Sequence, residues 1–467
     1  PFVFVDEIEI YRGADSLLGD NVAEGASYTM SVAPNYSLTT DAGDATQLTD
    51  GLYASTGQSM WSQQAAVGWM HKTTPVAVTM DLGTIQPIQG VSFHTTASES
   101  SEVTWPQVVN VLVSDDGVNF YDAGELTSLS IEHGLPDPTP SPYINHTYWT
   151  DRLNTHGRYV KIVAQNNPYL FVDEIEVYRG HDAMLALPFE GDAISDLSSF
   201  MANSRDRALA ARRIVLDAQT LQQQVAATPS LTQEQRDGLN DSIDSVVQQA
   251  MYLPAVDPAT FHVTLPMNSL HEQLFGVQAQ LWQYQGHEPL TAWTTPLWDQ
   301  LTLFQSPETT PASLSVAMMQ NEYRSAAFNL SNATDSDMTV TLNFEDLPDG
   351  VNPAYIKVQQ VEWTDTTIGA PIAAALPDAA MGPNGYLIDI PAGMTRQVWL
   401  TFNPVTTNPG TYNGTIVIDG GAAETVFTRG PGASDPAAGY GYAVPGYARA
   451  DYRRQCCPPG FYLAGFE

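Results

Sequence analysis

The sequence predicts a mainly β protein in which two antiparallel β-sandwiches are joined by an α-helical hairpin segment. Short runs that alternate apolar and polar residues, separated by turn residues, fill the first 180 positions and return after about residue 300. Between them, apolar residues recur at steps of three and four, the period of an amphipathic helix. Runs of strands without alternating helices form sandwiches rather than parallel sheets.

A thirteen-residue stretch occurs twice and marks a domain boundary. Pro1–Gly13 and Pro168–Gly180 are identical at ten of thirteen positions, at an offset of 167 residues. A period this long is one whole domain, because solenoid and propeller repeats run to about 20–50 residues. We therefore expect residues 14–180 to be one domain and 1–13 to be the terminal strand of a preceding repeat. Alternatively, the first copy adds to the sheet of a neighbouring subunit as a donor strand.

Six short motifs follow one another within residues 14–180. They are Leu48–Gly51 (LTDG), Trp61, Asp81–Gly83 (DLG), Ser114–Gly117 (SDDG), Gly157–Ile162 (GRYVKI) and Phe171–Tyr178 (FVDEIEVY). In this order they resemble the discoidin domain, also called the coagulation factor 5/8 type C domain or family 32 carbohydrate-binding module. The resemblance implies an eight-stranded, jelly-roll-like sandwich.

The resemblance also implies a calcium site. In sugar-binding members, the ion is held by the loop after the LTDG-like motif and by an acidic residue of the last strand. Matched by position, these ligands are Asp50, Thr56 and Glu174, with backbone carbonyls from residues 51–57. Ca²⁺ prefers six to eight oxygen ligands, including carboxylates and carbonyls. The alternative is that Asp50 caps a turn and Glu174 is a solvated strand residue.

A sugar site needs a flat aromatic face and a few oriented polar groups. Trp69, His71 and Lys72 lie together in the loop-like stretch 68–74, and His94 ends a predicted strand. We expect these four residues to bind carbohydrate, with Trp69 and His71 as the aromatic face. The competing explanation is packing, because a lone histidine is more often structural.

Residues 181–300 are predicted to be helical. An apolar stripe runs from Ala211 to Val225, and Thr228–Ser230 breaks it. Thr232 and Gln235 have the spacing of a capping box that begins a second helix. Two helices of about twenty residues with a short loop make an antiparallel hairpin. A third helix is expected from Ser269 to Tyr284.

Residues 301–420 are predicted to form a second, immunoglobulin-like sandwich. Three segments resemble the sandwich that precedes the catalytic barrel in bacterial glycoside-hydrolase-like proteins: Asn321–Ser325, Pro391–Leu400 and Pro409–Gly414. In that family a barrel with a catalytic acid pair follows. Here only 47 residues follow Gly420. Residues 421–467 are rich in Gly, Pro, Ala and Tyr, and we expect a linker or disordered tail.

The charge balance limits the partners. The chain has 18 basic and 52 acidic residues, a formal charge of −34. Nucleic acid and anionic membrane surfaces are therefore disfavoured as partners. The sequence contains no run of 18 apolar residues, so it predicts no membrane-spanning helix.

Two functions follow from these observations. The first is a bacterial extracellular or cell-surface protein that binds polysaccharide or glycan as the non-catalytic portion of a glycoside-hydrolase-like protein, with calcium as its cofactor. The second is an extracellular assembly protein that associates with itself through edge strands. No residue set supports catalysis, since the sequence has no nucleophile elbow and the matched motifs are scaffold motifs.

Overall fold

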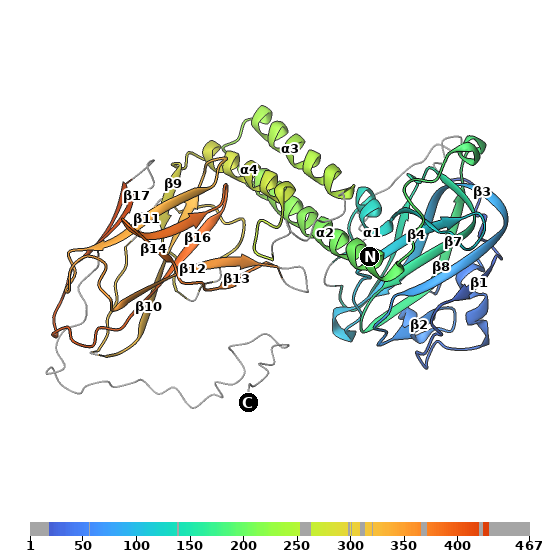
Figure 1. Cartoon of the computed structure of the whole chain (residues 1–467), viewed down its shortest axis with the longest axis horizontal. Helices are drawn as coiled ribbons and strands as arrows, with labels where there is room; N and C mark the ends of the chain where they lie inside the picture. The colour runs from blue at the N-terminus through green and yellow to red at the C-terminus, as the bar shows by residue number, and fades with distance from the viewer. Residues whose placement is uncertain are drawn as a thin grey trace, which may run out of the picture.

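The computed structural model describes residues 18–428, apart from 56, 138–139, 253–262, 298, 300, 309–312, 320, 366–370 and 420–423. Over this part the chain is mainly β, and helices lie between two β-rich regions, as predicted (Figure 1). The first copy of the repeat, at 1–13, lies outside the described residues. No helix in the described part has the length and apolarity to cross a bilayer.

The first β region contains eight strands, the number that the resemblance implies. They are β1 (Ser27–Met30), β2 (Val67–Met70), β3 (Val76–Ala97), β4 (Val108–Ser114), β5 (Tyr121–Glu125), β6 (Ile144–Thr150), β7 (Thr155–Gln165) and β8 (Tyr169–Arg179). Strand β3 belongs to both layers of the sandwich. Its first part pairs with β1 and β7, and its second part pairs with β6 and β8. Strand β2 pairs with β8, and β4 lies between β7 and β5.

Strand β4 is buried on both faces. Val109, Val111 and Val113 contribute to the core between the two layers. On the opposite face, Val108 and Leu112 pack against the helix that follows the sandwich. A run with hardly any polar residue is typical of a strand that is covered on both sides.

The helical region is built on three helices: α2 (Leu197–Ala227), α3 (Gln233–Met251) and α4 (Ser269–Tyr284). The predicted capping box of Thr232 and Gln235 is present at the start of α3. Helix α2 has 31 residues and begins fourteen residues before the apolar stripe, because the Asp196 side chain accepts bonds from two backbone N–H groups there. A further short helix, α1 (Leu126–Leu129), follows β5.

The second β region is a sandwich of two five-stranded sheets. One contains β9 (Leu290–Trp293), β10 (Arg324–Asn332), β12 (Ile356–Thr364), β13 (Ile372–Ala375) and β16 (Thr395–Phe402). The other contains β11 (Met338–Glu345), β14 (Ala380–Gly382), β15 (Gly385–Ile390), β17 (Thr415–Asp419) and β18 (Glu424–Thr428). Strand β18 lies within the predicted tail, so that prediction is wrong for residues 424–428, which pair with β17 as an edge strand.

Candidate functional site

The candidate site lies on the outer face of β8, under the loop of residues 50–55. Strand β8 pairs with β3 in a register that joins Glu174 to His94 and Val172 to Thr95. Asp173 is left without a partner and forms a β-bulge. In a regular strand, neighbouring side chains point to opposite faces. The bulge instead lets Asp173 and Glu174 both bind the loop outside the core.

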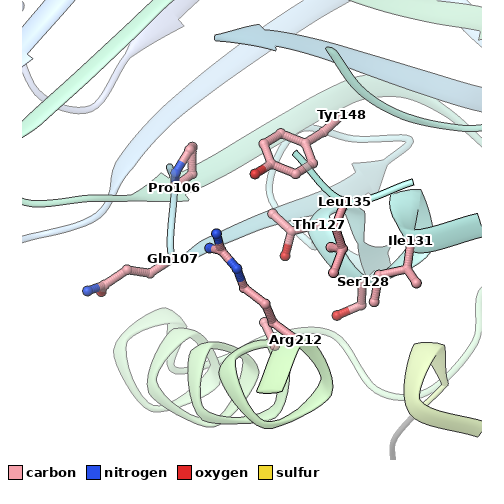
Figure 2. Close-up of a pocket in the computed structure, with 9 residues that line it drawn as sticks. Pro106, Gln107, Thr127, Ser128, Ile131, Leu135, Tyr148 and Arg212 are labelled. Atoms are coloured by element: carbon pink, nitrogen blue, oxygen red, sulfur yellow. The ribbon is translucent and has the colours of Figure 1, made fainter. Parts of the chain in front are cut away.

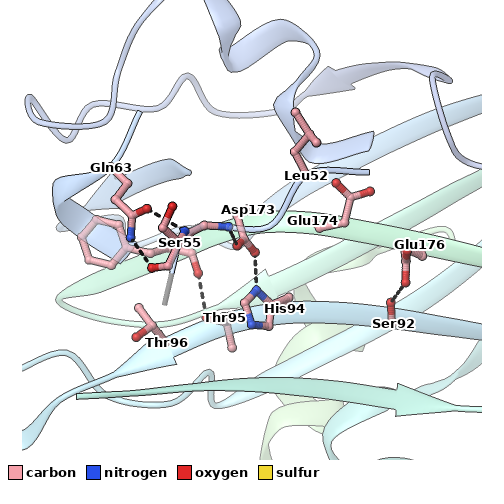
Figure 3. A network of polar contacts seen from close by, with 12 residues as sticks. Leu52, Ser55, Gln63, Ser92, His94, Thr95, Thr96, Asp173, Glu174 and Glu176 are labelled. Carbon is pink, nitrogen blue, oxygen red and sulfur yellow. Dashed lines mark hydrogen bonds and ion pairs between the residues drawn. The ribbon is translucent and has the colours of Figure 1, made fainter. Parts of the chain in front are cut away.

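Asp173 joins this loop to β3. Its side chain is fully buried, and one carboxylate oxygen accepts a 2.7 Å bond from the Ala54 backbone N–H. The other lies 2.5 Å from Nδ1 of His94. Because a carboxylate accepts this bond, the hydrogen sits on Nδ1, and Nε2 is the ring nitrogen that remains for a ligand. The His94 side chain is 12% exposed, so Asp173 fixes the orientation of an imidazole near the surface (Figure 3).

Glu174 is the unusual member of the pair. Its Oε2 accepts a 3.1 Å bond from the Gly51 backbone N–H, while its buried Oε1 has no hydrogen-bond partner. Burial raises the pKa of Glu174 to about 8; the Gly51 bond opposes this shift, and the charges of Asp50, Glu176 and Asp173 add to it. A cation would stabilise a buried carboxylate in which one oxygen has no hydrogen-bond partner.

Of the predicted metal ligands, the structure brings Asp50 and Glu174 to the same loop. Asp50 is exposed, and its Oδ1 accepts a 2.9 Å bond from the Leu52 N–H, as expected of a turn cap. Thr56 lies outside the described residues. Glu174 is fully buried, so the alternative of a solvated strand residue is wrong.

Another group of three potential metal ligands lies elsewhere in the first sandwich. In the described part of the chain, Glu132, His133 and Asp151 form a group whose ligand atoms lie within 4.8 Å of one another. Glu132 is already bound by Arg152, at 2.6 Å. That guanidinium repels a metal ion, so the group does not favour one.

The loop carries two exposed apolar side chains next to His94. Leu52 is 63% exposed and Tyr53 is 46% exposed. The Tyr53 ring meets the His94 ring edge to face, with centroids 4.9 Å apart. Burial, followed by the charge of the nearby Glu176 carboxylate, raises the pKa of Tyr53. We call Leu52, Tyr53, His94 and Glu176 the loop platform.

The Glu176 carboxylate of this platform is held on β8 by neighbouring hydroxyl groups. Ser92 on β3 donates a 3.1 Å bond to it, and the Tyr178 hydroxyl donates another. These bonds fix the carboxylate beside Tyr53, where it remains half-buried. Glu176, Tyr53 and Leu52 are site residues that sequence reasoning missed. The alternation of Glu174 and Glu176 in a strand was the available signal for Glu176.

A second group of aromatic side chains packs around Phe171. Its half-buried members are Tyr36, Trp61, Tyr143 and Tyr169. Phe171 and Asp173 both lie on the outer side of β8, so this aromatic cluster adjoins the loop platform. His71 belongs to it, because its ring lies 5.7 Å from that of Tyr169.

The predicted carbohydrate-binding set does not form as one unit. Trp69 is 1% exposed, and its Nε1 donates a 2.9 Å bond to the Val32 carbonyl. The prediction for Trp69 is therefore wrong: residues 67–70 form strand β2, which turns the indole into the core. His71 is exposed and Lys72 half-buried beyond the end of that strand. His94 contacts Tyr53 and Asp173 instead.

Comparisons with known proteins find similarity only among solved structures. No family model and no curated protein matches the chain. CpGH89CBM32-6, produced by Clostridium perfringens, has 17% identity and a TM-score of 0.22, and the match covers 34% of this chain and 100% of that one. Chitosan-binding module 1 from the chitosanase/glucanase of Paenibacillus sp. IK-5 has 18% identity, 34% and 98% coverage and a TM-score of 0.22.

A third similar structure is the lectin domain of lectinolysin, solved in complex with Lewis B antigen. It has 16% identity and a TM-score of 0.22, and the match covers 35% of this chain and 98% of that one. Because these identities and TM-scores are low, the chain's own residues must support any function.

Proposed function

We propose that the first sandwich is a carbohydrate-binding domain whose loop platform holds a pyranose. The observation that carries this proposal is the pairing of Tyr53 with His94. Tyr53 offers an exposed aromatic ring, which can stack on the apolar face of a sugar. Beside it, His94 is held in one orientation by a buried carboxylate and can bond a sugar hydroxyl.

Hydrogen bonds anchor the loop platform to strand β8, and this anchoring favours ligand binding. Backbone N–H groups of Gly51 and Ala54 anchor the loop to Glu174 and Asp173, on either side of Leu52 and Tyr53. A loop that is already fixed loses little conformational entropy when a ligand binds. The Glu176 carboxylate offers a further acceptor for a sugar hydroxyl.

Replacement of Tyr53 tests the proposal. The protein is screened on a glycan array, and binding of the best glycan is then measured by isothermal titration calorimetry. We expect Tyr53→Ala to weaken binding about tenfold or more, because stacking area is lost. The control is Tyr323→Ala, which removes a tyrosine that is 72% exposed outside this sandwich.

Three results separate the alternatives. Unchanged binding by Tyr53→Ala, together with loss of binding by Tyr169→Ala, would move the site to the aromatic cluster. Unchanged binding by both variants would contradict a site on this face. A wild-type protein that binds no glycan on the array would contradict the proposed function itself.

We propose further that calcium is held beside the 50–55 loop by Glu174 and Asp50, the residues that the resemblance implies. This proposal is supported by the buried Oε1 of Glu174, which has no hydrogen-bond partner and which a hard cation could bind. When bound, the ion would supply a fixed positive charge. Glu174 would then stay ionised, and its bond to Gly51 would hold the loop more firmly.

Calcium removal tests this second proposal. We expect dialysis against a chelator to lower the melting temperature, because a ligand at a hundred times its Kd stabilises the folded state by about 2.7 kcal/mol. Added calcium should restore it in the wild type but not in Glu174→Gln. Glu132→Gln is the matched control. A calcium response that disappears in Glu132→Gln and persists in Glu174→Gln would place the ion at the other group.

We propose that the chain acts outside the cell, as a non-catalytic part of a polysaccharide-processing protein. The acidic composition suits solubility in such a medium. Immunoblotting of cell fractions tests the location, and a purely cytoplasmic signal would contradict it.

The repeated segment 1–13 favours self-association as a second role, since a copy of the β8 sequence could pair with the sheet of another subunit. Multi-angle light scattering that gives the monomer mass at all concentrations would exclude it.

A further inference from the structure

A pocket lies where the first sandwich meets helix α2, distinct from the loop platform. Its floor and walls come from the segment before β4, from α1, from β6 and from α2 (Figure 2). The enclosed part of this space has room for about one water molecule, and the rest is open to solvent, so only a small polar group can enter it. Ile131 and Ala208 supply apolar wall, whereas Gln107, Ser128, Tyr148 and Arg212 bring polar groups to it.

Arg212 is an unusual arginine in this acidic chain. Its neighbour Arg213 is paired with Asp217 at 2.6 Å, Arg158 is paired with Asp81 at 2.7 Å, and Arg236 donates to backbone carbonyls. Arg212, in contrast, forms no hydrogen bond or ion pair with any residue that the structure describes. Figure 2 shows its guanidinium group rising from α2 toward the Tyr148 hydroxyl. A positive charge therefore faces the pocket without a counter-ion.

Thr127 of the pocket lining donates its hydroxyl hydrogen to Glu125, but the other two hydroxyl groups there have no acceptor among the described residues. Tyr148 is 2% exposed, and its hydroxyl makes no hydrogen bond within the described part of the chain. Burial raises the pKa of Tyr148, so this hydroxyl keeps its proton and can donate it. Ser128 is 7% exposed, and its Oγ has no partner among the described residues either. Neither hydroxyl oxygen is completely buried, so a ligand that enters the pocket can accept a hydrogen bond from each.

Among the residues that the structure describes, no carboxylate accepts a bond from the Arg212 guanidinium or from the Tyr148 and Ser128 hydroxyl groups. Glu125 is the acidic residue whose charge acts on Tyr148. Both of its oxygens already accept bonds, from the backbone of Val109, Thr127 and Ser128. A cation and two hydroxyl donors thus face a space whose lining contains no carboxylate, and an oxyanion would pair with them.

We propose that this pocket binds the carboxylate of a small molecule, with Arg212 as counter-ion and Tyr148 and Ser128 as hydrogen-bond donors. A planar carboxylate matches the fork of an arginine guanidinium. The net charge of −34 disfavours a more highly charged anion such as phosphate. The carboxylate could belong to a free acid or to a uronic acid residue of a glycan. The proposal does not depend on sugar binding at the loop platform.

Calorimetric titration of the full chain with acetate, glucuronate and phosphate tests this proposal, with ionic strength held constant by sodium chloride. We expect acetate and glucuronate to bind at one site and to raise the melting temperature. Tighter binding of glucuronate would assign the ligand to uronic acids, and equal binding would assign it to the carboxylate alone. Tighter binding of phosphate, or no saturable binding of either acid, would overturn the proposal.

Two variants of the pocket locate the site. Arg212→Gln should weaken acetate binding about tenfold or more, since it removes a charge-assisted pair. Tyr148→Phe should weaken it about threefold to tenfold, since it removes one neutral donor. The matched control is Arg205→Gln, which removes an arginine of the same helix that is paired with Asp206. Wild-type acetate affinity in Arg212→Gln would overturn the assignment, and circular dichroism shows whether each variant is folded.

Discussion

At the residue scale, a buried histidine makes the first sandwich sensitive to acid. His146 lies on β6, with its ring 5.7 Å from that of Trp105 and 4.6 Å from that of Tyr148. Its Nε2 is buried and has no hydrogen-bond partner among the described residues. Burial lowers the pKa of His146 to about 4, and the charges of His94 and Arg212 contribute. The folded state therefore holds this ring neutral at pH values where an unfolded chain would protonate it.

The sign of the pH effect follows from this difference. As the pH falls from about 6.5 to about 4, the unfolded state takes up the proton first, so the free energy of unfolding decreases. We expect His146→Gln to remove about 1–3 kcal/mol of this loss. Urea titrations at pH 7 and pH 4.5 measure it, with the exposed His71→Gln as control. An equal loss in wild type and His146→Gln would contradict the assignment.

At the residue level, the sequence indicates a side chain's place where it depends on its own strand, and not where strand pairing decides it. The acidic motif at the end of the domain singles out Glu174, whose role as a calcium ligand stays a prediction. The bulge at Asp173 could not be found, because only the register with β3 creates it. The sequence indicates a loop at Trp69, since the neighbouring Gly68 is typical of turns. A four-residue strand is too short for its alternation to be recognised.

At the element scale, a buried charged network holds α2 against α4. Arg213 and Asp217 lie one turn apart on α2, and both are at least 95% buried. His271 on α4 is fully buried and lies 3.0 Å from the Asp217 carboxylate through its Nε2. The three side chains satisfy one another in the core of the helical region.

Removing one charge from this network should destabilise the protein strongly. We expect Asp217→Asn to lower the free energy of unfolding by about 3–5 kcal/mol, because the buried Arg213 loses its 2.6 Å partner and keeps only the longer, 3.8 Å contact with Asp365. Asp206→Asn, which breaks the exposed pair with Arg205, should cost about 1 kcal/mol or less. Chemical denaturation of both variants gives the comparison. Similar values for the two would show that burial does not control the effect.

The sequence predicted the elements better than their lengths. The start of α3 and the full extent of α4 were located, since caps and periodicity are local signals. The apolar stripe does not indicate about the first four turns of α2, because Met201, Ser204 and Ala208 face a sandwich rather than another helix. The nearly unbroken apolar run of β4 was the signal that something covers that sandwich.

At the scale of the whole molecule, helix α2 packs against both sandwiches. Near its beginning, Met201 and Ala208 pack on β4 of the first sandwich, and Ser204 donates a 2.6 Å bond to buried Asn110. Farther along, its apolar stripe shares one core with Trp363 and Met394 of the second sandwich. The predicted boundary at Gly180 therefore divides the sequence but does not divide the packing.

Separation at that boundary should expose apolar surface. We expect a fragment of residues 1–180 to melt at a lower temperature than the first sandwich does within the full chain, and to bind a hydrophobic dye, because Val108, Leu112 and Val163 lose their cover. Differential scanning calorimetry and dye fluorescence measure both effects. A fragment with an unchanged melting transition and no dye binding would show that α2 contributes nothing to the sandwich.

The length of α2 determines how the two sandwiches are oriented relative to each other. A helix advances about 1.5 Å and turns about 100° with each residue. A single residue inserted after Leu209, between the part of α2 that packs on β4 and its apolar stripe, would rotate the loop platform by roughly a quarter of a revolution relative to the second sandwich. The number of residues in α2 therefore determines the direction in which the loop platform faces relative to the second sandwich.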